Sequence, residues 1–327
     1  MKKRSKTDAI ARLLMSVGVL IGSSLPALAQ DDYPSKVIRI IVPSNAGSGT
    51  DDSTRRLAKY LAESRGWHAV VQNLGGANGM IAAEEFTHTA TDGYTLFAGG
   101  TSAMTYSPVA YKDVRYDTVK DFTPVALSIV VPDTLVVPAK SPITSVADLV
   151  EKLRANPNKY FYASSGVNRV ATELFLQNAH LSAVNVNYRS SPAALTDLIG
   201  GSINFMLVDS IAASPMIRSG LIRALAFTSK KRLNALPDVP TMTEAGYPGV
   251  VIYEWNGFFL RKDAPVEEVN KLHQAIVDYY KTPAAQKYID TIGGQYEDIT
   301  PGALKKWIAD QLRENRAIYA RAGIRPQ

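Results

Sequence analysis

Short runs of β-branched residues alternate with helical patterns along most of the chain. Strand-like runs occupy residues 37–42, 70–72, 95–98, 160–163, 184–188, 203–207 and 222–228. Residues 51–64 show a helical pattern instead, because Leu57 and Leu61 fall four positions apart with alanines beside them. This alternation predicts an α/β fold with largely parallel sheets.

The chain has 327 residues, which is long enough for two domains. After residue 265 helical patterns follow one another without strands between them, so we expect these helices to pack back onto the first domain. Two α/β lobes with this connectivity leave a cleft between them. Ligands of such folds bind at the carboxyl ends of strands and at domain interfaces.

The first 29 residues have the pattern of a cleaved secretory signal. A basic head is followed by an uncharged run at residues 13–25 and then by Ala27-Leu28-Ala29. A membrane-spanning helix would need about 20 apolar residues, and this run is shorter. We therefore expect cleavage after Ala29 and a periplasmic protein.

Composition excludes several classes of protein. The chain has no cysteine, so disulfides, thiolate catalysis and cysteine-ligated metal sites are ruled out. Residues 1–29 carry +4 of the formal charge of +6, and the +2 that remains does not indicate a nucleic-acid partner. The four histidines are scattered without metal-ligand spacing, so we expect no metal site. We expect no cofactor either.

The most informative stretch lies between the first strand and the first helix. It contains the candidate ligand-binding residues Ser44, Asn45, Ala46, Gly47, Ser48, Gly49, Thr50 and Asp51. Small residues let a ligand approach the backbone closely, and the start of a helix offers unpaired N–H groups, which together make an anion site. An ordinary tight turn capped by Asp51 would have the same composition, and residue types alone leave both readings open.

A second loop of this kind precedes the helical run that contains Leu174 and Phe175. Its candidate residues are Ser164, Ser165, Gly166 and Arg169, and a third hydroxyl-bearing strand end contains Thr101 and Ser102. Two such loops facing each other across a cleft could hold one carboxylate between them.

Motifs for nucleotide binding and catalysis are missing. No Gly-Lys-Ser/Thr follows the first loop, and Asp52 stands where a dinucleotide fingerprint needs its third glycine. No Gly-x-Ser-x-Gly elbow occurs either, and no base stands beside a nucleophile, so we predict no catalytic residues.

Several motifs in one order resemble a known family. They are Tyr33-Pro34-Ser35-Lys36, Gly49-Thr50-Asp51, Asp92-Gly93-Tyr94-Thr95-Leu96, the segments 116–122, 192–198 and 236–241, and Glu244-Ala245-Gly246. Over residues 33–324 the chain resembles the periplasmic solute receptors of tripartite tricarboxylate transporters, the Bug-type (Bordetella uptake gene) proteins.

This resemblance implies a two-lobed type II periplasmic binding protein, a Venus flytrap whose mixed sheets are flanked by helices and joined by two strand hinges. Residues 31–130 and 250–327 would form lobe 1, and residues 131–249 would form lobe 2. The hinge strands would lie near residues 128–136 and 251–259, where Trp255 would wall the cleft.

The resemblance also implies a function. The protein would be a monomeric, non-catalytic receptor that binds a small carboxylate and delivers it to membrane permease subunits. The ligand could be an aliphatic di- or tricarboxylate, an aromatic acid or an amino acid. Signalling to a two-component sensor is an alternative, and a periplasmic hydrolase is a more remote one.

Some residues are assigned by this resemblance, and one departs from it. Thr101, Ser102 and Asp209 occupy positions that border the cleft in relatives. Arg169 stands where relatives carry a histidine, in a loop about three residues shorter than theirs. We hypothesise that Arg169 pairs with a ligand carboxylate. The alternative is an arginine on the helix surface.

Overall fold

The computed structural model describes residues 33–188 and 190–326. The predicted signal segment, residues 1–29, lies outside the described residues. The chain divides into two compact units, Met1–Ser35 and Lys36–Gln327, and every helix and strand that the structure describes lies in the second.

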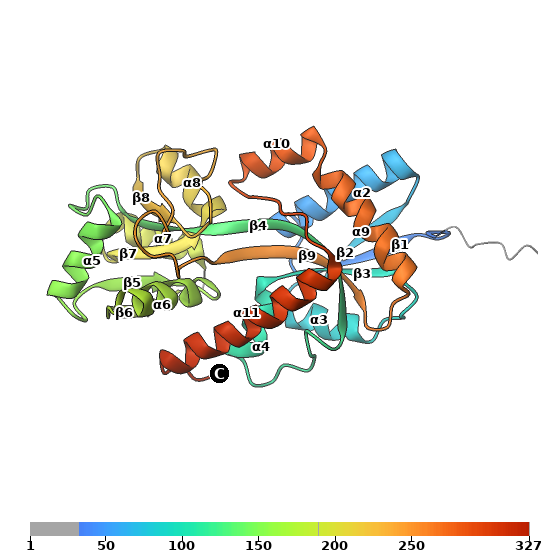
Figure 1. Ribbon diagram of the computed structural model, residues 1–327, viewed down its shortest axis with the longest axis horizontal. Coiled ribbons are helices and arrows are strands. Elements are labelled where there is room, and N and C mark those ends of the chain that lie inside the picture. Colours follow the sequence, from blue (N-terminus) through green and yellow to red (C-terminus); the bar gives the residue numbers. More distant parts are fainter. Residues whose placement is uncertain (1–32, 189, 327) are drawn as a thin grey trace, which may run out of the picture. The chain divides into compact units, whose positions relative to one another are not determined.

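One half of this second unit is built on strands in the order β2-β1-β3-β9-β4 (Figure 1). The strands are β1 (Ile38–Val42), β2 (Ala69–Asn73), β3 (Thr95–Gly100), β4 (Phe122–Pro138) and β9 (Tyr253–Arg261). β1 is parallel to β2 and β3, whereas β9 runs antiparallel to β3 and β4. The carboxyl ends of β1, β2 and β3 therefore meet at one edge.

Helical segments follow these strands along the chain. They are α2 (Gly49–Arg65), η1 (Ala77–Gly79), α3 (Met80–Thr87), η2 (Ser102–Tyr106), α4 (Ser107–Ala110), α9 (Val266–Tyr280), α10 (Pro283–Thr291) and α11 (Pro301–Arg321). α9 packs on β4 and α2, and α11 packs on β4 and η2. The expectation that the last helices return to the first part of the chain is thus confirmed.

The other half uses strands from the middle of the chain. The elements are α5 (Val146–Ala155), β5 (Phe161–Ser164), α6 (Asn168–Ala179), β6 (Val184–Asn187), α7 (Ser191–Gly200), β7 (Phe205–Asp209), α8 (Ser210–Arg218) and β8 (Ile222–Phe227). β5 is parallel to β6 and β7. Each parallel pair is connected through a helix, as parallel strands require.

β4 belongs to both halves. Its first part pairs with β9 as far as Pro132. From Asp133 onward it pairs with both β7 and β8, antiparallel throughout. The prediction of largely parallel sheets is therefore wrong. The strand–helix alternation predicted the parallel units correctly, but β4 and β9 run against their neighbours and make the sheets mixed.

Each half has its own apolar core. Phe86, Phe97 and Phe122 form the aromatic centre of the first, with ring centroids 5.2–5.6 Å apart. In the second half, Tyr162 packs against Phe205 with centroids 5.8 Å apart. Separate cores allow each half to hold its shape while the strands between them bend.

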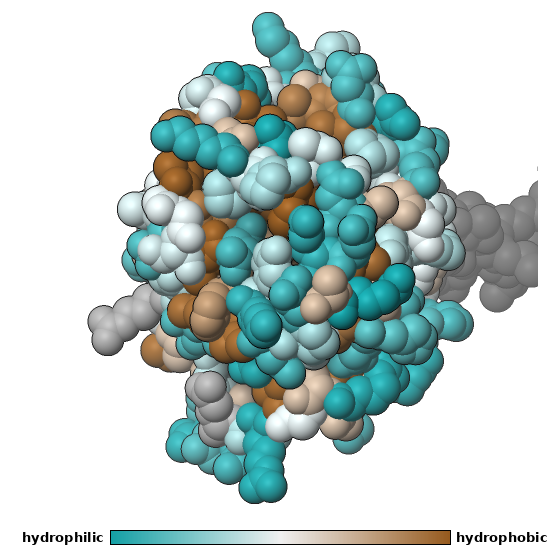
Figure 2. All heavy atoms as spheres, turned by 90° about the vertical axis from the view of Figure 1, so that its left-hand side faces the viewer, coloured by the Kyte–Doolittle hydropathy of each residue, from teal (hydrophilic) through white to brown (hydrophobic). Residues whose placement is uncertain are grey.

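The face of the second half is mostly hydrophilic in the view of Figure 2, with apolar residues in small separate patches. Within the described part of the chain, no helix combines the length and the apolar character that crossing a bilayer demands.

Candidate functional site

The first predicted loop connects β1 to α2 and is held by its own hydrogen bonds. Ser48 is the N-cap of α2, and its hydroxyl accepts a hydrogen bond from the N–H of Asp51 at 3.2 Å. The same hydroxyl lies 2.6 Å from that of Ser44. Gly47 has a φ of 82°, a conformation that favours glycine. The turn thus brings the first amides of α2 to the sheet edge, where they can attract an anion.

The side chain of Asp51 is buried beneath this loop and stabilises it. Its buried carboxylate accepts hydrogen bonds from the N–H of Gly47 at 2.8 Å, from Arg55 Nε at 2.9 Å and from Asn73 Nδ2 at 2.9 Å. Burial acts to raise the pKa of this carboxyl, but the hydrogen bonds outweigh it and the pKa is lowered. These contacts agree with the alternative that Asp51 serves the turn itself.

A cavity of about 480 Å³ opens beside the ends of the three parallel strands. Its walls include Ser44, Asn45, Gly49 and Thr50 after β1, residues 75–79 after β2, Gly100 at the end of β3 and Ser102 just after it. Ala46, Gly47, Ser48 and Asp51, also predicted, are not among its lining residues. The cavity therefore lies where parallel α/β sheets bind their ligands.

The glycine-rich wall after β2 was not among the predicted sites. A Cβ on Gly75 would lie 2.4 Å from Asn45 Oδ1 and 3.2 Å from the Asn45 backbone nitrogen, so any larger residue would force Asn45 to move. Gly76 and Gly79 have φ values of 125° and 85°. Three glycines directly after a strand-like run are the signal that identifies such a loop.

β9 forms a further wall of the cavity. Trp255 and Asn256 are among its lining residues. The Thr101 hydroxyl accepts a hydrogen bond from the Trp255 N–H at 2.7 Å, and the Thr50 hydroxyl donates to Asn256 Oδ1 at 3.2 Å. Ser102 faces this cavity, whereas Thr101 lines a smaller one of about 40 Å³ beside it.

In the second predicted loop, the two serines are engaged within their own half. The buried Ser164 hydroxyl accepts a hydrogen bond from Asn185 Nδ2 at 2.7 Å, and the Ser165 hydroxyl lies 3.0 Å from that of Ser191. Neither serine lines the 480 Å³ cavity.

Gly166 and Arg169 line a different cavity, of about 400 Å³, together with Tyr106 and Tyr319. Among the described residues, Arg169 Nε has no hydrogen-bond partner, and it lies 3.9 Å from the Glu173 carboxylate. That carboxylate already accepts a hydrogen bond from the Tyr162 hydroxyl at 2.6 Å. Arg169 is therefore a cation with unused hydrogen-bonding capacity.

The two cavities adjoin, because Asn78 lines both of them. The two predicted loops thus border neighbouring cavities rather than a single one. Asp209, from the second half, does line the 480 Å³ cavity, where it also caps α8 by accepting the Ala212 N–H at 2.8 Å.

Three carboxylates gather where β4 meets its neighbours. Asp133 stands opposite Asp209 of β7, and Val131, two residues earlier, stands opposite Glu254 of β9. Opposed residues share a face and side chains alternate along a strand, so the three carboxylates lie on one face. Asn168 Nδ2 donates to Asp133 Oδ1 at 3.1 Å and to Glu254 Oε1 at 3.3 Å.

Burial raises the pKa of each of these carboxyls. The charge of Asp209 raises the pKa of Asp133 further, and the charges of Asp133 and Asp209 raise that of Glu254. The hydrogen bonds from Asn168 oppose these effects only partly. We name Asp133, Asp209 and Glu254 the carboxylate cluster.

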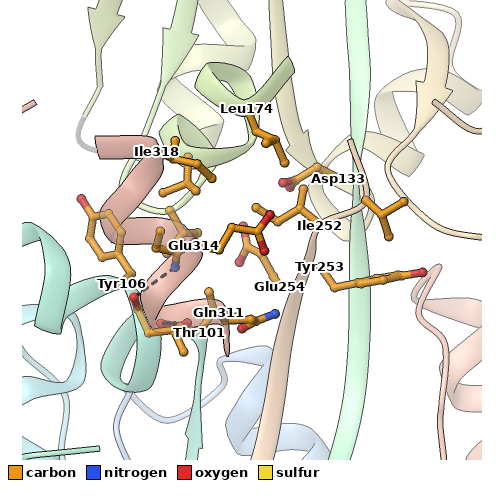
Figure 3. Close-up of a pocket in the computed structure, with 15 residues that line it drawn as sticks. Thr101, Tyr106, Asp133, Leu174, Ile252, Tyr253, Glu254, Gln311, Glu314 and Ile318 are labelled. Atoms are coloured by element: carbon orange, nitrogen blue, oxygen red, sulfur yellow. Dashed lines mark hydrogen bonds between the residues drawn. The ribbon is translucent and has the colours of Figure 1, made fainter. Parts of the chain in front are cut away.

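The 40 Å³ cavity lies against this cluster. Figure 3 shows the carboxylates of Asp133, Glu254 and Glu314 turned toward it. Within the described ranges, no group of three or more histidines and carboxylates is arranged to hold a metal ion. Asp133 and Glu254 were not among the predicted residues, because isolated acids in two strands carry no sequence signal until the register is known.

Comparison with known proteins identifies the family of the chain. A sequence model described as "Tripartite tricarboxylate transporter family receptor" matches residues 53–324. The chain belongs to this family. The resemblance seen in its motifs is thereby confirmed.

Relatives of this receptor match along nearly their whole length. Protein BugT of Bordetella pertussis is 31% identical over 323 residues, which cover 97% of this chain and 99% of BugT. The structure of a Rhodopseudomonas palustris protein with adipate has 30% identity and a TM-score of 0.77, with 90% of this chain and 100% of the other covered. MatC from the same organism, with bound malate, has 25% identity and a TM-score of 0.71 over 88% and 99% of the two chains.

These two structures confirm the predicted fold class. The receptor has the type II periplasmic binding architecture, with mixed sheets, flanking helices and strands that connect two lobes.

Proposed function

We propose that this receptor captures a small organic carboxylate in the 480 Å³ cavity and presents it to the membrane permease subunits of a tripartite transporter. The supporting observation is the wall of turns at the ends of β1, β2 and β3. Two structural relatives hold adipate and malate, which are acids of this class.

Backbone amides supply most of the attraction for the anion. The start of α2 contributes about 0.3–1 kcal/mol through its dipole, and the hydroxyl of Ser102 adds a donor at the wall. A ligand that extends past Asn78 reaches Arg169, whose planar fork suits a second carboxylate. Ser164, Ser165 and Gly166 hold the backbone around Arg169 in place.

Capture requires the two lobes to close. We assign residues 31–130 and 250–327 to lobe 1 and residues 131–249 to lobe 2, with β4 and the start of β9 as the hinge. The protein is exported with cleavage after Ala29, works as a monomer and performs no chemistry on its ligand.

Calorimetry and thermal-shift measurements with adipate, malate and phthalate test this function. At a free ligand concentration of 100 times the Kd, binding should stabilise the folded protein by about 2.7 kcal/mol and raise the Tm. Gly75→Ala should weaken binding at least tenfold, because the new methyl group displaces Asn45. Gly302→Ala is the matched control, since nothing lies within 4 Å of its Cβ position. If no carboxylate shifts the Tm, the proposal is wrong.

A further inference from the structure

We infer that carboxylate capture in the 480 Å³ cavity is coupled to the uptake of one proton by the carboxylate cluster of Asp133, Asp209 and Glu254. This inference rests on the proposed function, because it concerns the same cavity and the same class of ligand. It adds that the affinity of the receptor depends on pH.

The acidic side chains that line the cavity repel a bound anion. Asp209 and Glu254 both line it, and no lysine, arginine or histidine occurs among the described lining residues. A ligand carboxylate at the strand ends therefore shares a confined space with two acidic side chains. In such surroundings like charges interact strongly.

Few hydrogen-bond donors stabilise the negative charge of the cluster, and the side chain that bridges two of its members is neutral. Asn168 is neutral, and its amide is the donor shared by Asp133 and Glu254. Asp209 receives the Ala212 N–H at the start of α8. When all three carboxyls are ionised, two of them stand directly opposite each other across β4 and β7.

The groups packed around the cluster do not neutralise it. From α11, Glu314 adds a further carboxylate (Figure 3). The tyrosines that line the two cavities are Tyr106, Tyr253 and Tyr288. Arg169 follows Asn168 in the chain but lines the 400 Å³ cavity, where its charge acts on Tyr106.

A bound anion therefore favours the protonated form of the cluster. The pKa values of the three carboxyls are already raised in the free protein, and the ligand's negative charge raises them further. On binding, a proton from the solvent joins one carboxylate oxygen and one negative charge is removed from the wall. Above the pKa of the free cluster, affinity must then fall as the pH rises.

The test is the pH dependence of Kd for adipate and for malate, measured by calorimetry between about pH 7 and pH 9. Both acids remain fully ionised in this range. We expect Kd to increase by up to about tenfold per pH unit, the limit for one coupled proton. Repeating the titration in phosphate and in Tris, which differ in ionisation enthalpy, counts the protons taken up.

Glu254→Gln supplies a neutral side chain of the same shape. This variant should bind at least as tightly as the wild type at pH 9 and show a weaker pH dependence. Glu151→Gln, on the exposed surface of α5, is the matched control and should behave as the wild type.

Each other outcome overturns the inference. A Kd that is independent of pH, or a calorimetric proton count of zero, shows that the cluster does not respond to the ligand. Affinity that rises with pH shows that the ionised acids attract a cationic group instead. In both cases the acids still bind and the proposed function survives. If neither acid nor phthalate binds at any pH, the proposed function fails and the inference fails with it.

Discussion

The carboxylate of Asp51 accepts the backbone N–H of Gly47 at 2.8 Å and thereby closes the turn that forms one wall of the 480 Å³ cavity. The acid does not line the cavity. It fixes the shape of the backbone that does, and Arg55 and Asn73 hold it there.

We therefore expect Asp51→Ala to destabilise the protein. Three partly buried hydrogen bonds to a charged group are lost, and the free energy of unfolding should fall by about 2–4 kcal/mol in urea titrations. Asp52→Ala is the matched control, because Asp52 pairs with Arg56 on the exposed side of the same helix and should cost under about 1 kcal/mol. Equal losses for the two variants would contradict this role.

The carboxylate cluster predicts how stability depends on pH. The pKa of Glu254 is raised on folding, so the folded protein retains a proton that the unfolded chain releases above about pH 4.3. Stability should fall as pH rises above that value, with a slope of up to about 1.4 kcal/mol per pH unit for one such group. Glu254→Gln should flatten this slope in urea titrations between about pH 5 and pH 8. An unchanged slope would show that Glu254 ionises normally.

Arg169 predicts which ligands bind best. Replacing it with alanine should weaken binding of adipate by about 1.5–3 kcal/mol, because a charge-assisted hydrogen bond is lost. Arg169→Lys should recover only part of this, since lysine lacks the planar fork. Arg218→Ala, an exposed position on α8, is the control. Calorimetry that finds the same Kd for Arg169→Ala and the wild type would place Arg169 outside the binding site.

Trp255 offers an optical signal for binding. Trp255 is a lining residue of the cavity, and its buried indole ring lies 5.4 Å from the ring of Trp307 and donates from Nε1 to Gln311 at 2.8 Å. Binding of malate should change the intrinsic fluorescence, and Trp255→Phe should remove most of that change. Trp67→Phe should leave the change in place. Loss of the signal in Trp67→Phe instead would indicate a distant ligand site.

Local patterns in the sequence were sufficient for the elements and for one loop. The strand at 37–42 and the helix at 51–64 correspond to β1 and α2, because apolar periodicity reports burial directly. The small residues 44–50 correctly marked a turn at the end of a strand. Such features depend on neighbours in the chain.

Features that depend on register were not predictable in this way. Glu254 and Asp133 are far apart in sequence, and only the pairing of β4 with β9 brings them to one face. The placement of Arg169 in a separate cavity likewise depends on how α6 lies against α11. The antiparallel course of β4 and β9 has no local signal, since either direction buries the same side chains.

β4 passes unbroken through both halves of the receptor over 17 residues. Any rotation of one half against the other must then twist β4 as well as the start of β9 that pairs with it. Pro132 stands at the junction, opposite Tyr253, and its missing N–H weakens the ladder at that point. The backbone beside the carboxylate cluster thereby defines the axis of such a rotation. A change in the charge of the cluster therefore acts directly at that axis.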